Sequence, residues 1–151
     1  MPVTTCIFDA YGTLFDVAAS ARQAAAEPEY SAIKDDWQHL AEHWRAKQLN
    51  YSWLRAVTGA HCDFWQVTQE GLDWALEKTG HYGDTALRER LLQLYWELGA
   101  YPEVPAMLTA LKAAGLNTGI LSNGSPAMLR GAVDSAGIDG VLDGLLSVES
   151  V

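Results

Sequence analysis

The chain has 151 residues, of which 49% are hydrophobic and 19% are charged, and its formal net charge at pH 7 is -9. This length and apolar content predict one globular unit, or a core with an insertion, and exclude intrinsic disorder. The acidic balance argues against nucleic acids and anionic membranes as partners, because both attract basic surfaces. A small anionic substrate is compatible with it, since one or two cations inside a pocket suffice.

The two cysteines, Cys6 and Cys62, have no metal-binding spacing and suit reduced thiols. The first residues lack a basic segment followed by a long apolar one, and nowhere do 18 apolar residues follow one another. We therefore expect a cytoplasmic protein that is neither exported nor inserted in a membrane.

The chain is predicted to begin with one strand and to continue with helices. The apolar run from Val3 to Phe8 stops at Asp9, which is typical of a buried parallel strand. Residues 17–100 are expected to be almost entirely helical, because large apolar residues recur there at helical spacing. Three helices are predicted in this stretch: Trp37 to Leu54, Trp65 to Leu76 before Gly80, and a third capped by Asp84 and closed at Gly99.

Strands and helices alternate again after Tyr101 and Pro102. The predicted elements are a helix from Pro105 to Gly115, a strand from Leu116 to Leu121, a helix from Pro126 to Ala136 and a strand from Val141 to Val148. This order predicts an α/β fold with a Rossmann-like, doubly wound, mostly parallel sheet. Residues 1–16 and 101–151 would form its core domain, and residues 17–100 a helical cap domain inserted after the first strand.

The number of strands leads us to expect an incomplete chain. Three strands are fewer than the five or six that a doubly wound sheet usually has. Val151 also stops where a helix covering the sheet should begin.

The loop after the first strand carries two groups suited to chemistry. Asp9 and Thr13 lie four residues apart around Gly12, so a carboxylate and a hydroxyl can face one ligand. In an α/β fold, the loops at the carboxyl ends of strands hold the chemistry. From this loop alone, Asp9 is equally well explained as a nucleophile and as a cap that binds turn amides.

Two other positions offer groups that can bind an anion. Arg45 lies at the edge of the helix face formed by Ala41, Trp44 and Gln48, although an arginine on a helix is more often only solvated. Ser122 and Asn123 follow a strand and can donate hydrogen bonds to a carboxylate, although both residues are also turn formers.

Two motifs, in this order, resemble those of the haloacid dehalogenase superfamily. Phe-Asp-Ala-Tyr-Gly-Thr-Leu-Phe, residues 8–15, is similar to the first motif, whose first Asp is a nucleophile. Leu-Ser-Asn-Gly-Ser-Pro, residues 121–126, is similar to the second. Trp44-Arg45, Lys47-Gln48-Leu49 and the stretch from Tyr51 to Arg55 resemble the L-2-haloacid dehalogenase branch in particular.

The resemblance implies hydrolytic dehalogenation of short-chain (S)-2-haloacids to (R)-2-hydroxyacids and halide through an aspartyl ester. It implies that Asp9 is the nucleophile, that Thr13 orients it and that Arg45 is the cation near the halide. The substrate would be a small anionic halogenated carboxylic acid, and neither a metal nor a cofactor is expected. The residues implied to bind this substrate are Ala10, Tyr11, Arg45, Leu49, Phe64, Ser122 and Asn123, of which Leu49 and Phe64 are also ordinary core residues.

Three elements of the family have no counterpart in this sequence: a lysine after the third strand, a nearby tyrosine and a Ser/Asn/Asp cluster after a fourth strand. Lys112 is no substitute for the lysine, because it lies on a helix that leads into the second strand. We expect it near the opposite edge of the sheet.

Other functions remain as alternatives. Tyr11 stands where phosphatases of the superfamily have a second Asp as general acid, which favours a halide over a phosphate ester, although Tyr11 could also be only a packed aromatic. A magnesium-dependent small-molecule phosphatase is therefore the alternative enzyme. A non-catalytic binding module would follow if the chain truly ends at residue 151. His39-Leu40-Ala41-Glu42-His43 also matches the H-x-x-E-H pattern of zinc peptidases, but three fixed residues are a weak signal.

The tryptophans suggest an oligomer. Five of the six lie between Trp37 and Trp74, and the sixth is Trp96. A small helical cap would not bury so many large apolar side chains, so we expect a homodimer formed through the insert. Members of the L-2-haloacid dehalogenase branch are often dimers.

Overall fold

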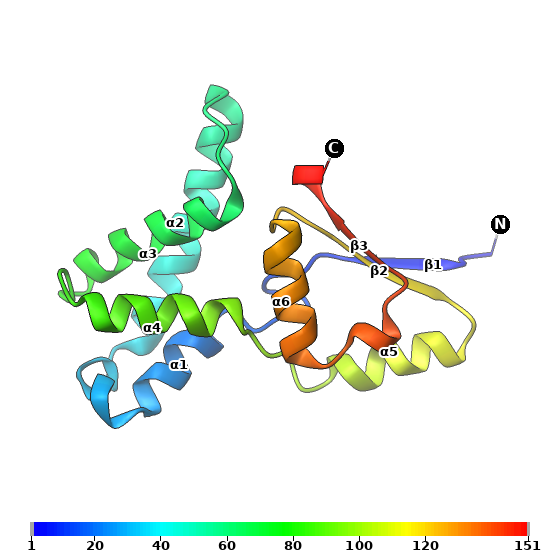
Figure 1. Cartoon of the computed structure of the whole chain (residues 1–151), viewed down its shortest axis with the longest axis horizontal. Coiled ribbons are helices and arrows are strands. Elements are labelled where there is room, and N and C mark those ends of the chain that lie inside the picture. The colour runs from blue at the N-terminus through cyan, green and yellow to red at the C-terminus, as the bar shows by residue number, and fades with distance from the viewer. Residues whose placement is uncertain (1, 151) are drawn as a thin grey trace. The chain divides into compact units, whose positions relative to one another are not determined.

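The structure of the chain, a computed structural model, describes residues 2–150. The chain divides into two compact units, Met1–Asp16 with Glu97–Val151 and, between them in sequence, Val17–Trp96. The first unit holds every strand of the described chain together with α5 and α6, and the second unit is helical (Figure 1). The chain returns to the first unit at Trp96–Glu97, whereas the sequence pattern placed this point at residue 100.

The first unit is built on a parallel three-stranded sheet in the order β1-β2-β3. Its strands are β1 (Thr5–Phe8), β2 (Asn117–Ser122) and β3 (Gly144–Ser147). Phe8 lies opposite Ile120, and Ser122 lies opposite Ser147. The carboxyl ends of all three strands therefore lie at the same edge of the sheet.

Two helices connect these strands and pack on the sheet. They are α5 (Val104–Ala113), which contacts β2, and α6 (Pro126–Ala136), which contacts β3. Ser125 caps α6 by accepting a hydrogen bond from the backbone N–H of Met128, and Gly137 ends the helix in the left-handed region at φ 66°. These caps satisfy terminal backbone groups and determine where α6 begins after β2 and where it ends.

The two faces of this sheet differ in exposure. Ile120 is fully buried, whereas Ile7, Leu121 and Leu146 are each about half exposed. Because neighbouring residues of a strand point to opposite faces, the exposed residues belong to one face and Ile120 to the other. The covered face is the one on which α5 and α6 pack.

The second unit contains α1 (Ala19–Ala26), a 3-10 segment (Pro28–Ile33), α2 (Trp37–Thr58), α3 (Phe64–Lys78) and α4 (Thr85–Trp96). Helices α2 and α3 have the most extensive contact, and α1 packs against α4. Gly71 favours the close approach of α2 and α3, since a Cβ there would lie only 3.1 Å from the backbone nitrogen of Gln48. The leucines of these helices form the buried core, among them Leu40, Leu72, Leu87 and Leu91.

An ion pair joins the start of the 3-10 segment to α4. Arg90 donates hydrogen bonds of 2.6–3.1 Å to both carboxylate oxygens of Glu27. These bonds from Arg90 lower the pKa of Glu27.

The sequence predicted the elements well, and the differences have local causes. The helix predicted to end at Leu54 continues to Thr58, where Gly59 in the left-handed conformation stops it. The strand predicted from Val141 to Val148 is shorter, because 3-10 turns occupy Asp139–Val141 and Val148–Ser150. The Thr118 hydroxyl donates to the carbonyl of Val141, which holds this backbone in its turn before pairing with β2 begins.

The expectation about the tryptophans was only partly right. Trp44 is buried, and Trp37, Trp65, Trp74 and Trp96 are half-buried. Only Trp53 is exposed, at 64%. Most of the tryptophans are therefore largely covered within this chain, and Trp44 belongs to the buried core.

Candidate functional site

Asp9 is the first residue after β1 and therefore lies at the edge where the strands end. Its side chain is exposed, and its Oδ2 accepts a hydrogen bond of 3.0 Å from the hydroxyl of Thr13. Within residues 2–150, no backbone N–H donates to this carboxylate. The structure thus brings the two residues together as expected, and it gives no support to the alternative of Asp9 as a turn cap.

The loop that carries these two residues is held by hydrogen bonds to the carbonyl oxygen of Ala10. That oxygen accepts hydrogen bonds from the N–H groups of Thr13, Leu14 and Phe15, at 2.9–3.3 Å. Gly12 makes the turn possible with a φ of 86°, which side-chain-bearing residues rarely adopt. Ala10 is fully buried, so the loop is anchored in the core while its polar side chains face outward.

Tyr11 is a packed aromatic in this structure. The residue is only 3% exposed, and its ring lies 6.0 Å from the ring of Phe15 and touches the second loop. A Cβ on Gly124 would lie only 2.7 Å from a ring carbon of Tyr11. The glycine thus allows the loop after β2 to lie directly against the loop after β1.

Ser122 and Asn123 stand at the end of β2, next to this contact. The buried Ser122 hydroxyl accepts a hydrogen bond of 3.1 Å from the N–H of Gly124, and Asn123 is exposed. The Ser147 hydroxyl, at the end of β3, donates to the carbonyl of Gly124 at 2.7 Å. Ser122 therefore takes part in turn formation as an acceptor. Its hydroxyl hydrogen can still be donated to another group.

Arg45 lies in the helical unit, on α2, and is half-buried. Its guanidinium donates a hydrogen bond of 2.8 Å to the side-chain oxygen of Gln48, so it is not simply a solvated arginine. Leu49 is half-buried on the same helix, and Phe64 is buried at the start of α3.

Three buried residues were not expected from the sequence to matter. Thr68, Tyr95 and Ser147 are buried polar residues that bond to predicted site residues or to their neighbours. Their sequence context is that of ordinary helix or strand residues. Only the three-dimensional contacts identify them.

The two histidines of the H-x-x-E-H pattern have other contacts. His39 is 2.7 Å from the carboxylate of Asp36, and the ring of His43 packs edge-on against Trp74. Across residues 2–150, no three side chains among His, Cys, Asp and Glu are grouped so that they could hold a metal ion. The structure therefore gives no support to a zinc site at this pattern.

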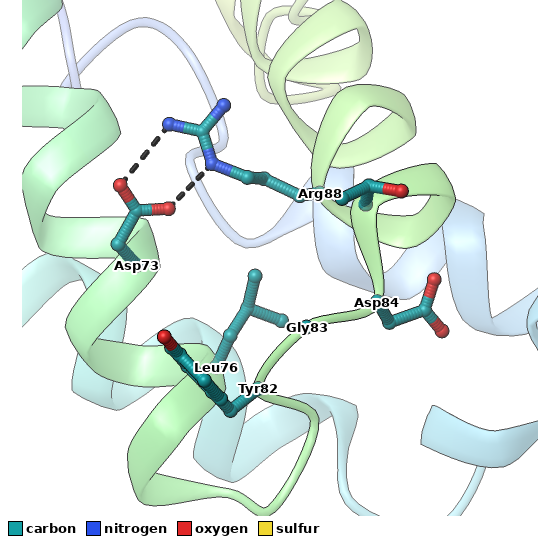
Figure 2. Close-up of a pocket in the computed structure, with 7 residues that line it drawn as sticks. Asp73, Leu76, Tyr82, Gly83, Asp84 and Arg88 are labelled. Atoms are coloured by element: carbon teal, nitrogen blue, oxygen red, sulfur yellow. Dashed lines mark hydrogen bonds and ion pairs between the residues drawn. The ribbon is translucent and has the colours of Figure 1, made fainter.

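The helical unit also contains a shallow pocket of about 200 Å³ between α3 and α4 (Figure 2). Its lining residues are Asp73, Leu76, Tyr82, Gly83, Asp84, Thr85 and Arg88. Arg88 spans its upper part and bonds both oxygens of Asp73, which raises the pKa of the guanidinium. None of the predicted site residues lines this pocket.

No helix within residues 2–150 is both long enough and apolar enough to cross a membrane.

Comparison with known proteins gives consistent matches. The family model of haloacid dehalogenase-like hydrolases matches residues 3–151. (S)-2-haloacid dehalogenase 1 from Pseudomonas sp. strain CBS-3 is 45% identical over 99% of the chain, and (S)-2-haloacid dehalogenase 4A from Burkholderia cepacia is 43% identical over 97%. These matches cover 64% and 61% of the two relatives, so the chain spans less than two thirds of their length.

A solved structure gives the same match in three dimensions. L-2-haloacid dehalogenase from Xanthobacter autotrophicus, with chloropropionic acid covalently bound, is 38% identical with a TM-score of 0.84. The match covers 99% of this chain and 58% of the other. The family model, these relatives and this structure confirm the resemblance and the fold class predicted from the sequence, and the chain belongs to the family of haloacid dehalogenase-like hydrolases.

Proposed function

We propose that the protein hydrolyses short-chain (S)-2-haloacids to (R)-2-hydroxyacids and halide, with Asp9 as the nucleophile. The observation that carries the proposal is the hydrogen bond from Thr13 to Asp9 in an anchored loop at the carboxyl edge of a parallel sheet. This bond holds one carboxylate oxygen, so that the other can be directed at a substrate carbon. Relatives that are 43–45% identical bear the name (S)-2-haloacid dehalogenase, and one similar structure holds chloropropionic acid covalently.

The reaction has two steps. In the first, a carboxylate oxygen of Asp9 attacks C2 of the substrate from the side opposite the halogen, and the halide leaves with the bonding electrons. The product is an ester between Asp9 and the inverted C2. In the second, water attacks the ester carbonyl, releases the (R)-2-hydroxyacid and leaves one water oxygen in the carboxylate. One proton is released per turnover.

The other predicted residues have roles that follow from charge. Both the substrate carboxylate and the departing halide are anions, so the reaction requires a cation and hydrogen-bond donors. We assign the cation near the halide to Arg45, and the donors to Ser122 and Asn123. Ala10, Tyr11, Leu49 and Phe64 are proposed to contact the substrate.

Tyr11 separates this proposal from phosphate-ester hydrolysis. A phosphatase needs a general acid for the ester oxygen, and superfamily phosphatases carry it two residues after the nucleophile. Here that position holds a buried phenol ring packed against Phe15 and Gly124. Halide is the conjugate base of a strong acid and leaves without protonation, so a ring in this position is compatible with dehalogenation.

The test is turnover by the protein with its natural termini in ¹⁸O-labelled water. With (S)-2-chloropropionate, we expect chloride release without added metal, and mass spectrometry should find ¹⁸O in the peptide that contains Asp9. Asp9→Asn should abolish chloride release. If the label enters the product in a single turnover and not the peptide, the ester mechanism is wrong.

The same assay distinguishes the proposed function from the two alternatives, a phosphatase and a binding module. Magnesium-dependent phosphate release from an aryl phosphate, with no chloride release, would favour the phosphatase. Absence of both activities in a folded protein that still binds 2-chloropropionate would favour a binding module. Asp16→Asn is a suitable control, because Asp16 is a nearby carboxylate of the same unit to which we assign no chemical role.

We infer further that the protein is a cytoplasmic homodimer. Cys6 and Cys62 are thiols and form no disulfide, as suits a reducing compartment. Trp53, Leu54 and Val57 are exposed at 64%, 52% and 87%, and their spacing places them on one face of the last turns of α2. Sedimentation should show a dimer that Trp53→Glu converts to a monomer, whereas a monomeric wild type would overturn this inference.

A further inference from the structure

A buried glutamine on α2 is bonded to the arginine that the proposed reaction places near the halide. Gln48 is 1% exposed, and its side-chain oxygen accepts the 2.8 Å hydrogen bond from Arg45. Its side-chain nitrogen donates to the hydroxyls of Thr68 on α3, at 2.7 Å, and of Tyr95 on α4, at 3.0 Å. Three helices of the unit thus converge on one amide.

The direction of these hydrogen bonds is determined by the backbone. The Thr68 hydroxyl has a single hydrogen, which it donates to the carbonyl of Phe64 at 2.7 Å. Thr68 must therefore accept from Gln48, and only the NH₂ group of the amide can donate to it. The oxygen of Gln48 is consequently turned towards Arg45.

The surroundings make this arrangement rigid. Thr68 is fully buried, Tyr95 is 3% exposed and the ring of Trp44 lies 4.9 Å from that of Tyr95. The Trp44 indole donates to the backbone carbonyl of Thr68 at 2.8 Å, and Gly71 brings α3 against the backbone of Gln48. An apolar side chain of similar size could fill the same space without the cost of burying an amide.

We propose that Gln48, oriented by Thr68 and Tyr95, is a positioning residue that holds the guanidinium of Arg45 for the departing halide. This inference rests on the proposed dehalogenase function. Gln48 itself touches no reacting atom. Gln48 restricts the Arg45 side chain before substrate binds. Less conformational entropy of Arg45 is then lost when negative charge develops on the halogen.

The first test follows Arg45 directly and does not depend on turnover. Rotation of the Arg45 guanidinium, measured by ¹⁵N NMR and assigned with Arg45→Lys, should be hindered in the wild type. It should become fast in Gln48→Met, which keeps the side-chain length but has no amide. Equal mobility in both proteins would overturn the proposal, whatever the activity of the enzyme.

The second test uses the leaving group. Values of kcat/KM report the steps up to halide departure, so they are compared for (S)-2-chloropropionate and (S)-2-bromopropionate. Chloride is the poorer leaving group and needs more electrostatic help. We expect Gln48→Met to lower kcat/KM about tenfold for the chloro substrate and less for the bromo substrate, because the Arg45 side chain is no longer immobilised.

Thr68→Val provides a milder variant, and Thr79→Val its matched control. Both hydroxyls donate to the carbonyl four residues earlier in the chain, but the Thr79 hydroxyl donates to Ala75, and Thr79 lies at the C-terminal cap of α3, eleven residues after Thr68. Thr68→Val should change the chloro-to-bromo ratio in the same direction as Gln48→Met, whereas Thr79→Val should leave it unchanged.

The outcomes are distinguishable. A uniform loss for both halides, with a lower midpoint of urea unfolding, would mean that Gln48 only stabilises the fold and would overturn the positioning role. A wild type that releases no halide would contradict the proposed function. The NMR comparison would then still decide whether Gln48 holds Arg45.

Discussion

Lys112 and Asp143 form an ion pair in which the ammonium group lies 2.7 and 2.6 Å from the two carboxylate oxygens. Asp143 directly precedes β3, and it also accepts a hydrogen bond from the backbone N–H of Thr118 near the start of β2. The pair therefore lies at the amino ends of the strands, opposite to Asp9. This position agrees with the expectation that Lys112 does not serve as the catalytic lysine of the family.

The ion pair predicts a pH dependence of stability. The bonds from Lys112, together with that from Thr118, lower the pKa of Asp143. A carboxyl group whose pKa is lower in the folded state stabilises that state above its unfolded pKa, about 4, and this contribution is lost as the pH falls through the folded pKa. Urea unfolding should therefore show a wild-type advantage over Asp143→Asn at pH 7 that shrinks below about pH 4. An advantage that grows in acid would contradict the assignment.

Removal of the Thr13 hydroxyl should impair the proposed nucleophile. Thr13→Val keeps the shape of the side chain but cannot donate to Asp9, so we expect kcat with 2-chloropropionate to fall about 10- to 100-fold, the value of a hydrogen bond to a charged group. Thr13→Ser, which retains the hydroxyl, is the control and should recover most of the activity. An equal loss in Thr13→Ser would show that the fit of the side chain in the loop, and not the hydrogen bond alone, is what matters.

A methyl group at Gly124 should disturb the contact between the two loops. Its Cβ would lie 2.7 Å from the ring of the buried Tyr11, so Gly124→Ala is expected to destabilise the fold by about 1–3 kcal/mol. Gly140→Ala is a matched control, because a Cβ at that position would have no atom within 4 Å. Thermal unfolding of both variants measures the difference, and equal midpoints would show that the loops can move apart without cost.

Replacement of Arg45 by lysine should cost more than the conserved charge suggests. Lysine is a point charge on a flexible stem and cannot reproduce the planar guanidinium bonded to Gln48. We expect kcat/KM for 2-chloropropionate to fall at least about tenfold, as for a lost charge-assisted contact. Arg55→Lys, on the same helix but paired with Glu70, should change it little. Unchanged kinetics in Arg45→Lys would remove Arg45 from the proposed site.

Much of the fold could be predicted from local sequence patterns. The helix from Pro126 to Ala136 has the predicted bounds, because Ser125, Pro126 and Gly137 are cap signals that act over a few residues. The end of α2 and the length of β3 were less accurate. Apolar spacing does not mark where strand pairing starts, and the side-chain bond from Thr118 to Val141 comes from a distant part of the chain.

The sequence by itself determined the family, the order of the elements and the loop in which Asp9 and Thr13 meet, because these depend on motifs and on contacts within a few residues. Only the tertiary structure revealed that Tyr11 packs against Gly124 and that Gln48 connects Arg45 to Thr68 and Tyr95. Arg45 and Gln48 are three residues apart on one helix, but the partners in the other contacts are 20 to 113 residues apart, as between Gln48 and Thr68 and between Tyr11 and Gly124. Local periodicity contains no information about such pairs, since they are brought together by the packing of whole helices and loops.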